Sequence, residues 1–309
     1  MAILYHQLMI MYILIALGYL LRKIKFFTEK EVMALSSYAI NIAMTASILS
    51  GMNIYYSADK VKLVVFIMAF QIAAEVAIYL VLNNTYGKYH RRQAGHKKIY
   101  LFALLYCNAA MVGYPIVTAM FGQMASFIAS LHIIAMNISM FSVGMALIKS
   151  NDAKREKIDI RKIFTPTSVI TFAGLILFFC RVTYPSVIGD TIKTLSNTCM
   201  PVAMIVTGAM LAEYQLKKVF LDIRAYVISI VRLLIIPLLV FFVFKYILHV
   251  QDDVIIYTEV IIFACPSPSG LGPFVKLYGG DYELAVHIVS LSAILSSVTM
   301  PLLMTLIQL

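Results

Sequence analysis

Charged residues are scarce in this sequence. Asp, Glu, Lys and Arg make up 13% of the 309 residues, whereas an ordinary soluble domain carries about 25%. Hydrophobic residues make up 61% and the mean hydropathy is +0.89, so the chain has too little polar surface to cover itself in water. No stretch remains that could form a soluble domain. The composition therefore predicts an integral membrane protein in contact with the lipid bilayer.

Enzyme signatures are missing as well. We find no His-Glu-x-x-His, no Gly-x-Ser-x-Gly and no Cys/His cluster with metal-ligand spacing, and the four cysteines all lie in apolar segments, as small buried residues do. These absences argue against an enzyme, a cofactor and a metal site. The formal net charge of +10 would suggest a nucleic-acid partner in a soluble protein, but here the loops hold the charge, and we expect none.

Apolar segments follow one another along the whole chain. A membrane-spanning helix needs ~20 apolar residues, and ten segments of about that length are present. They run over residues 2–21, 32–52, 61–82, 99–120, 124–148, 163–183, 187–211, 224–248, 254–278 and 283–307. The first is followed by basic residues and not preceded by them, which is the reverse of a cleavable signal peptide. The sequence predicts an all-α protein with ten transmembrane helices.

Basic residues predict the orientation in the membrane. Nineteen of the 25 Lys and Arg residues lie in the loops after segments one, three, five, seven and nine, five lie on the opposite side, and Arg232 lies within a span. Cytoplasmic loops carry the excess of Lys and Arg. We therefore expect a multi-pass protein of the plasma membrane with both termini on the extracellular or periplasmic side.

The chain divides into two halves of five segments, 1–149 and 150–309. Because five is odd, the second half begins on the side where the first ends and is inverted. Segments four and nine each carry a Gly/Pro break, Cys107–Pro115 and Cys265–Pro273, with eight residues from Cys to the last Pro in both. Broken helices at corresponding positions of two halves are the best sequence indication of a transporter binding site.

The two breaks are predicted to meet near the middle of the bilayer. Asn108 lies about 14 Å from the inner end of its segment and Pro266 about 18 Å from the outer end of its own, at 1.5 Å per residue, in a core about 30 Å thick. Two half-helix N-termini would then face one centre, where their unpaired N–H groups favour an anion. The alternative is a pair of ordinary proline kinks in packed helices.

The break motifs resemble a known family. Asn108-Ala-Ala-Met-Val-Gly-Tyr-Pro115, continuing to Phe121-Gly122, looks like the first crossover of the auxin efflux carrier family, and Pro268-Ser-Gly-Leu-Gly-Pro273 is similar to the second crossover of its plant PIN-type members. Asn197-x-x-x-Pro201 and Pro301 also fit. The chain lacks the long central loop of plant members, so it resembles the compact bacterial branch. One departure is Thr45, where the family usually has proline.

The resemblance implies a secondary transporter that moves a small organic anion, a mono- or dicarboxylate of malate-like or auxin-like type, by an elevator mechanism. Helices one, two, six and seven would form a scaffold, and helices three to five and eight to ten a transport domain. The sequence leaves open whether the protein forms a homodimer. The predicted substrate-binding residues are Asn108, Gly113, Tyr114, Pro115, Ser267, Pro268, Ser269 and Gly270, with Asn41 and Asn197 facing them from the scaffold. Interhelical hydrogen bonding is the alternative role for Asn41 and Asn197.

Ionisable residues inside the spans are functional hypotheses by default. Glu75 and Arg232 lie about 10 Å deep by helix rise in equivalent helices, and we predict that they take part in coupling. Arg232 could instead pair with Glu75 or extend to the inner headgroups. His132 and His287 are more typical of packing residues. A sodium-coupled carrier of the bile-acid type shares the expected architecture, but we expect Glu259 near the outer rim, away from the crossover. A membrane sensor is the alternative from another class.

Overall fold

The computed structural model describes residues 2–89, 94–149, 166–182, 184–212 and 216–308. In these residues every regular element is a helix. Six helical stretches are long and apolar enough to cross a membrane: Glu29–Met52, Ala58–Asn84, Gly95–Ile148, Ser186–Leu211, Ile223–Ile247 and Tyr282–Ile307. The described parts of the ten predicted segments are mainly helical, and the main exceptions are the unwound stretches 106–108 and 264–270 in segments four and nine. The arrangement of ten spans as two inverted repeats stays a prediction, and the boundary between the repeats lies at residues 150–165, outside the described part.

The first half begins with α1 (Ala2–Lys23), then α2 (Glu29–Tyr38) and α3 (Met44–Met52), joined by a π-helical turn at Ala39–Ala43, and the long α4 (Ala58–Tyr89). Next come α5 (Ala94–Leu105), a π-turn at Ala109–Gly113, α6 (Tyr114–Ser139), a π-turn at Met140–Gly144, and α7 (Met145–Lys149). Helix α6 contains two apolar segments, because Gly122 (φ 70°) bends the chain between them.

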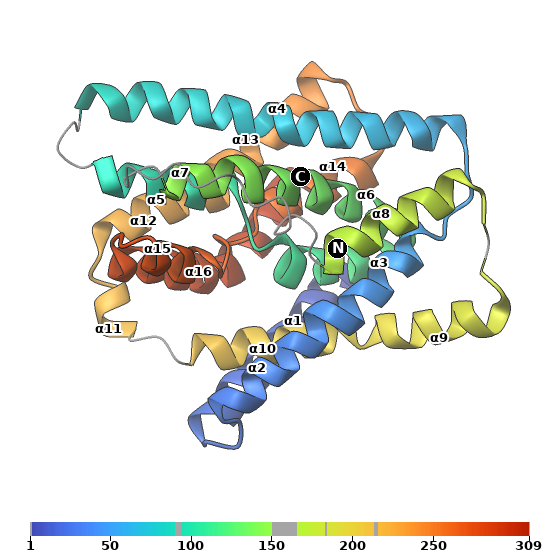
Figure 1. Ribbon diagram of the computed structural model, residues 1–309, viewed down its shortest axis with the longest axis horizontal. Helices are drawn as coiled ribbons and strands as arrows, with labels where there is room; N and C mark the ends of the chain where they lie inside the picture. The colour runs from blue at the N-terminus through green and yellow to red at the C-terminus, as the bar shows by residue number, and fades with distance from the viewer. Residues whose placement is uncertain (1, 90–93, 150–165, 183, 213–215, 309) are drawn as a thin grey trace.

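The second half holds α8 (Pro166–Phe179), α9 (Ser186–Asn197), α10 (Cys199–Leu211) and the short α11 (Leu216–Val219). Then α12 (Ile223–Ile230) and α13 (Ile236–Phe242) form one helical rod with π-turns at Val231–Ile235 and Val243–Ile247. Last come α14 (Asp253–Phe263), α15 (Leu271–Leu277) and α16 (Tyr282–Gln308). Figure 1 shows α4 along one side of the molecule and α1, α2 and α10 along the other, with α5, α6, α14 and α16 between them.

Local sequence sets several helix starts. Thr28 and Glu31 form a capping box at α2, with Thr28 N–H donating to Glu31 Oε2 at 2.6 Å. The Asp222 carboxylate accepts from the backbone N–H of Arg224 and caps α12. The Arg224 guanidinium also binds Asp222 and lowers the pKa of this carboxyl to about 2. Asp222 is therefore ionised at neutral pH, which suits the positive N-terminus of a helix.

Helices α1 and α10 pack with their backbones in contact. A Cβ on Gly18 would collide with the carbonyl of Ile205, and a Cβ on Gly208 with the carbonyl of Ile15. Small residues allow this approach between helices in a membrane, where van der Waals packing drives association. Thr45, at the position where the family usually has proline, donates its hydroxyl to the carbonyls of Asn41 and Ile42. The helix therefore continues there, with a π-turn in place of a proline kink.

Candidate functional site

Both predicted breaks are present, and they touch each other. Helix α5 ends at Leu105 and residues 106–108 are non-helical; α14 ends at Phe263 and α15 begins at Leu271. The Asn108 N–H donates to the carbonyl of Pro266 at 2.8 Å, and the Ser267 hydroxyl donates to the carbonyl of Ala103 at 3.2 Å. Prolines and unwound turns leave backbone groups unpaired, and here each break supplies partners for the other. We call these two segments, 106–108 and 264–270, the crossover.

Gly113 allows the chain that follows the first break to approach the second break closely. A Cβ on Gly113 would lie 2.7 Å from the Cys265 sulfur, closer than side chains tolerate. The Cys107 thiol in turn donates to the carbonyl of Ile262 at 3.3 Å. Residues from the two halves of the chain therefore form one compact centre inside the protein.

Arg232 donates hydrogen bonds to the backbone of this centre. It lies in the π-turn Val231–Ile235 and is 1% exposed. Its Nε donates to the carbonyl of Cys265 at 3.1 Å and its Nη1 to the carbonyl of Leu104 at 2.8 Å. These carbonyls lie at the C-terminal ends of the two broken helices, where the helix dipole is negative and cations are favoured. Among the described residues no carboxylate forms an ion pair with Arg232, so its charge is offset by carbonyl dipoles.

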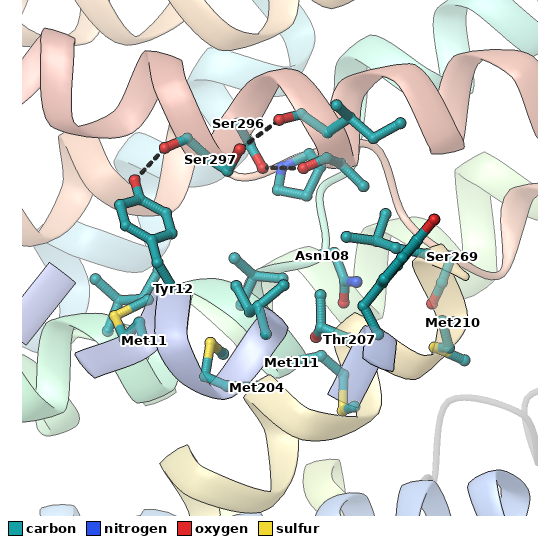
Figure 2. Close-up of a pocket in the computed structure, with 18 of the residues that line it drawn as sticks. Met11, Tyr12, Asn108, Met111, Met204, Thr207, Met210, Ser269, Ser296 and Ser297 are labelled. Carbon is teal, nitrogen blue, oxygen red and sulfur yellow. Dashed lines mark hydrogen bonds between the residues drawn. The ribbon is translucent and has the colours of Figure 1, made fainter. Parts of the chain in front are cut away.

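A cavity of about 490 Å³ lies beside the crossover, whose residues form part of its lining. Ligand pockets usually measure about 300–1,000 Å³. Its walls come from α1, α2, α10 and α16 together with the crossover, and Figure 2 shows their side chains around it. The polar lining consists of neutral groups, and no residue among the described lining is charged. It comprises Tyr12, Tyr19, Ser36, Asn108, Thr207, Ser267, Ser269, Ser296 and Ser297.

Sulfur and hydrocarbon make up the remaining wall. Five methionines line the cavity: Met11, Met111, Met204, Met210 and Met300. Methionine is flexible and polarisable, and it adapts to apolar ligands of irregular shape. On α1 the lining residues recur along one face, as Met11, Ile15 and Tyr19 show by their spacing of four. The cavity therefore suits a molecule with an apolar body and few polar atoms.

The structure brings some of the predicted substrate residues to this cavity. Asn108, Ser267 and Ser269 line it. No described residue forms a hydrogen bond with the Asn108 side-chain amide, so its N–H₂ and C=O are free for a ligand. An amide can donate two hydrogen bonds and accept two. Of the predicted residues, Asn108 is the best placed to contact a polar group of a ligand.

The other predicted substrate residues lie outside the lining. Tyr114 is fully buried with its hydroxyl 3.0 Å from Ser126 Oγ, and Gly113 and Pro115 lie beside it at the start of α6, where the helix turns into the packed interior. Pro268 and Gly270 shape the turn before α15. Asn41 donates to Ser37 Oγ at 3.1 Å on its own helix, and Asn197 ends α9. Their contact with substrate stays a prediction.

Glu75 and Arg232 are both buried but do not hydrogen-bond each other in the described part of the chain. Glu75 is 5% exposed and accepts from Gln71 Nε2 at 2.8 Å and from the hydroxyl of Ser139. Arg232 points instead to the crossover carbonyls. Its burial means that it does not reach the headgroups in this structure. Their part in coupling stays a prediction.

Sequence reasoning missed one buried pair. His132 Nδ1 lies 2.9 Å from Glu259 Oε2, and the two side chains are 1% and 0% exposed. Helix α14 packs against α6 and encloses the Glu259 side chain, while its expected position near the outer rim stays a prediction. The signal was available: each is a lone ionisable residue in an apolar span. Sequence spacing could not show that two helices 127 residues apart would place them together.

The model of the membrane transport protein family, which comprises the auxin efflux carriers and their PIN-like relatives, matches residues 3–304. The chain belongs to this family. The predicted resemblance is thereby confirmed, together with its coarser consequences: a multi-pass membrane protein that transports a small molecule and belongs to a family of transporters, not enzymes. No curated protein matches the sequence. In this family member, the broken helices and the cavity beside them are the features on which a specific function can be argued.

Proposed function

We propose that this carrier moves a small organic monocarboxylate across the plasma membrane by an elevator mechanism, and that the cavity beside Asn108 is its substrate site. The proposal rests on two features of the cavity. The side-chain amide of Asn108 has no hydrogen-bond partner among the described residues, and the rest of the lining is neutral and rich in methionine. An amide donates to a carboxylate without burying a second charge. One such group suits one carboxylate and an apolar body.

A dicarboxylate of malate-like type fits the same cavity less well. Its second carboxylate would be desolvated against methionines and hydroxyls, and a buried charge needs a strong partner. Arg232 brings a positive charge close to the crossover, since Cys265, whose carbonyl it binds, precedes the cavity residue Pro266. The lining itself offers no second charged partner among the described residues. This lining favours monocarboxylates within the organic anion class.

The proposed architecture is ten spans in two inverted repeats, with α1–α3 and α8–α10 as the scaffold and α4–α7 and α12–α16 as the transport domain. The cavity has walls from both: α1 and α10 on one side, the crossover and α16 on the other. A site at such a boundary opens or closes when one unit slides against the other. This arrangement supports an elevator mechanism.

The contacts across this boundary differ at its two ends. With the orientation expected from the basic loops, the cavity extends toward the inner end, where Tyr19, Leu20 and Leu211 line it near the ends of α1 and α10. At the outer end Gln123 Nε2 donates to the carbonyls of Ser50 and Asn53 at 2.9 and 2.7 Å and ties the transport domain to the scaffold. We infer an inward-facing conformation.

A ligand screen of the purified protein tests the proposal. Indole-3-acetate and phenylacetate represent monocarboxylates, malate and succinate dicarboxylates, and indole-3-ethanol is a neutral control of similar shape. A ligand at 100 times its Kd stabilises the folded state by about 2.7 kcal/mol, which is measurable as a shift in Tm. We expect the aromatic monocarboxylates to raise Tm and to be taken up by proteoliposomes. Stabilisation by malate with no response to monocarboxylates would contradict the substrate class.

A further inference from the structure

The His132–Glu259 pair lies outside the lining of the cavity, and the His132 side chain contacts the Cys107 thiol of the crossover. His132 belongs to α6 and Glu259 to α14, and neither residue lines the cavity. The imidazole also packs edge-on against Phe263, with ring centroids 5.1 Å apart. A rigid, buried acid–base pair in the proposed transport domain therefore needs a role of its own.

One oxygen of Glu259 has no partner. Oε2 faces His132 Nδ1, whereas Oε1 is buried without a hydrogen bond from any described residue. Glu75 differs, because it accepts hydrogen bonds from Gln71 and Ser139. A buried anionic oxygen without a donor costs free energy, and a neutral carboxyl costs much less. Of these two acids, Glu259 is the one whose surroundings leave a place for a proton.

The charges around the crossover indicate when that proton would bind. The ionisable groups that face this region are Arg232 from the π-turn after α12, Glu75 from α4, His132 from α6 and Glu259 from α14. The thiols of Cys107 and Cys265 and the phenol of Tyr106 also face it. With Arg232 and His132 positive and both carboxylates negative, the region is neutral. A monocarboxylate in the cavity would leave one negative charge in a medium of low dielectric constant, which is unfavourable.

We propose that the His132–Glu259 pair is a proton-binding site, at which Glu259 takes up one proton when a monocarboxylate occupies the cavity, so that anion and proton cross the membrane together. The pair would release the proton with the anion on the other side. This rests on the proposed function, since it needs an anionic substrate. It assigns coupling to Glu259 in preference to Glu75, the residue that the sequence analysis selected.

The pair suits a proton better than a divalent metal ion. Such an ion needs several oxygen ligands around it, and the described residues hold no group of three His, Cys, Asp or Glu side chains that could bind one. His132 already occupies the position beside Oε2. A sodium ion bound at Glu259 Oε1 is the alternative, and the experiment must distinguish it from a proton.

Infrared difference spectroscopy can test proton binding without any substrate. The purified protein in lipid nanodiscs is titrated from pH 8 to pH 5, and the carbonyl band of a buried, protonated carboxyl is followed. We expect Glu259→Gln to remove this band, while Glu75→Gln and the exposed control Glu283→Gln keep it. Absence of the band from the wild type, or its persistence in Glu259→Gln, would overturn the proposal. This arm decides the proton site even if no carboxylate is transported.

Transport of radiolabelled indole-3-acetate into proteoliposomes tests the coupling, with protein-free liposomes to subtract diffusion of the neutral acid. One proton with one monocarboxylate carries no net charge, so wild-type uptake should follow the pH gradient and ignore a potential set by potassium and valinomycin. In Glu259→Gln, counterflow should persist, the pH-driven accumulation ratio should fall to one, and uptake should become sensitive to potential. The exposed control Glu283→Gln should behave as the wild type.

Two results would count against the coupling: pH-driven accumulation by Glu259→Gln at the wild-type level, or accumulation driven by a sodium gradient at equal pH. Absence of wild-type counterflow with every monocarboxylate tested would be a failure of the proposed function. The infrared titration would still show whether the pair binds a proton, so the two failures are distinguishable.

Discussion

The two breaks that form the crossover share their spacing of Cys and Pro but differ in what they contribute. The first is three residues long and leads through a π-turn into the 26-residue α6; it presents the side chain of Asn108 to the cavity. The second runs from Ala264 to Gly270 and leads into the seven-residue α15. It presents Pro266 and two serines. One half of the chain supplies the side-chain amide of Asn108 to the cavity, and the other supplies backbone and hydroxyl groups.

The same difference appears in the equivalent long helices. Helix α4 carries a carboxylate, Glu75, whereas the α12–α13 rod carries the guanidinium of Arg232. Only Arg232 reaches the crossover, and it binds one carbonyl from each break. In the proposed inverted repeat, duplication accounts for the placement of the breaks, and divergence of single side chains accounts for the proposed fit to an anion.

The largest expected effect concerns the side of the membrane on which each broken helix begins. If the repeats are inverted, residue 90 before α5 is cytosolic and residue 252 before α14 is external. In a background without reactive cysteines, a cysteine at position 252 should be labelled by an impermeant thiol reagent in intact cells, and one at position 90 only after permeabilisation. Labelling of both from outside would contradict the inverted arrangement. Position 90 lies outside the described residues, so the test is independent of the structure.

Replacement of Arg232 should have the next largest effect. Arg232→Gln removes the charge that serves both breaks, and hydrogen bonds to charged groups contribute about 1.5–3 kcal/mol each. We expect the Tm to fall and monocarboxylate binding to weaken by about 100-fold or more, at 1.4 kcal/mol per decade. Arg232→Lys keeps the charge but cannot span both carbonyls, so it should lose less affinity. Equal binding by Arg232→Gln and the wild type would separate Arg232 from anion recognition.

Asn108 tests the contribution of the first break alone. Asn108→Ala loses hydrogen bonds to a charged group and should weaken binding of indole-3-acetate by roughly 10- to 100-fold, with little change in Tm because the backbone of the break is held by Pro266. Asn108→Asp keeps the shape and adds a negative charge, so it should bind more weakly still. Asn41→Ala, outside the cavity lining, is the matched control. Wild-type affinity in Asn108→Asp would exclude an anionic ligand at this site.

The smallest effect concerns the close approach of the two breaks. Gly113→Ala forces the Cys265 sulfur to move, and overpacking of this kind costs about 1–3 kcal/mol. Gly272→Ala, in the second break motif, meets its nearest neighbours at an ordinary 3.4 Å and should cost less. The double variant Gly113→Ala/Cys265→Ala should recover most of the lost Tm, since it restores the space. Equal losses at both glycines would show that the two sides of the crossover are packed alike.

Much of the fold was accessible to sequence reasoning because apolar length and helix breakers act locally. The described parts of the ten apolar segments are mainly helical, and both predicted breaks are unwound. The π-turns were not predictable, since an extra residue in a helical turn depends on neighbours from other helices. The pairing of Glu259 with His132 was not predictable, because depth along one helix says nothing about which helix will cover a side chain.

The sequence by itself determined that this protein lies in a membrane, that its helices break at two related places, and that it belongs to a family of transporters, because composition and motif spacing are properties of the chain alone. Only the tertiary structure decided which side chains meet. It placed Asn108 in a neutral cavity with methionines from α1, α10 and α16, directed Arg232 to two carbonyls, and joined His132 to Glu259. These contacts join residues far apart in the chain, and helix packing, which no local pattern records, brings them together.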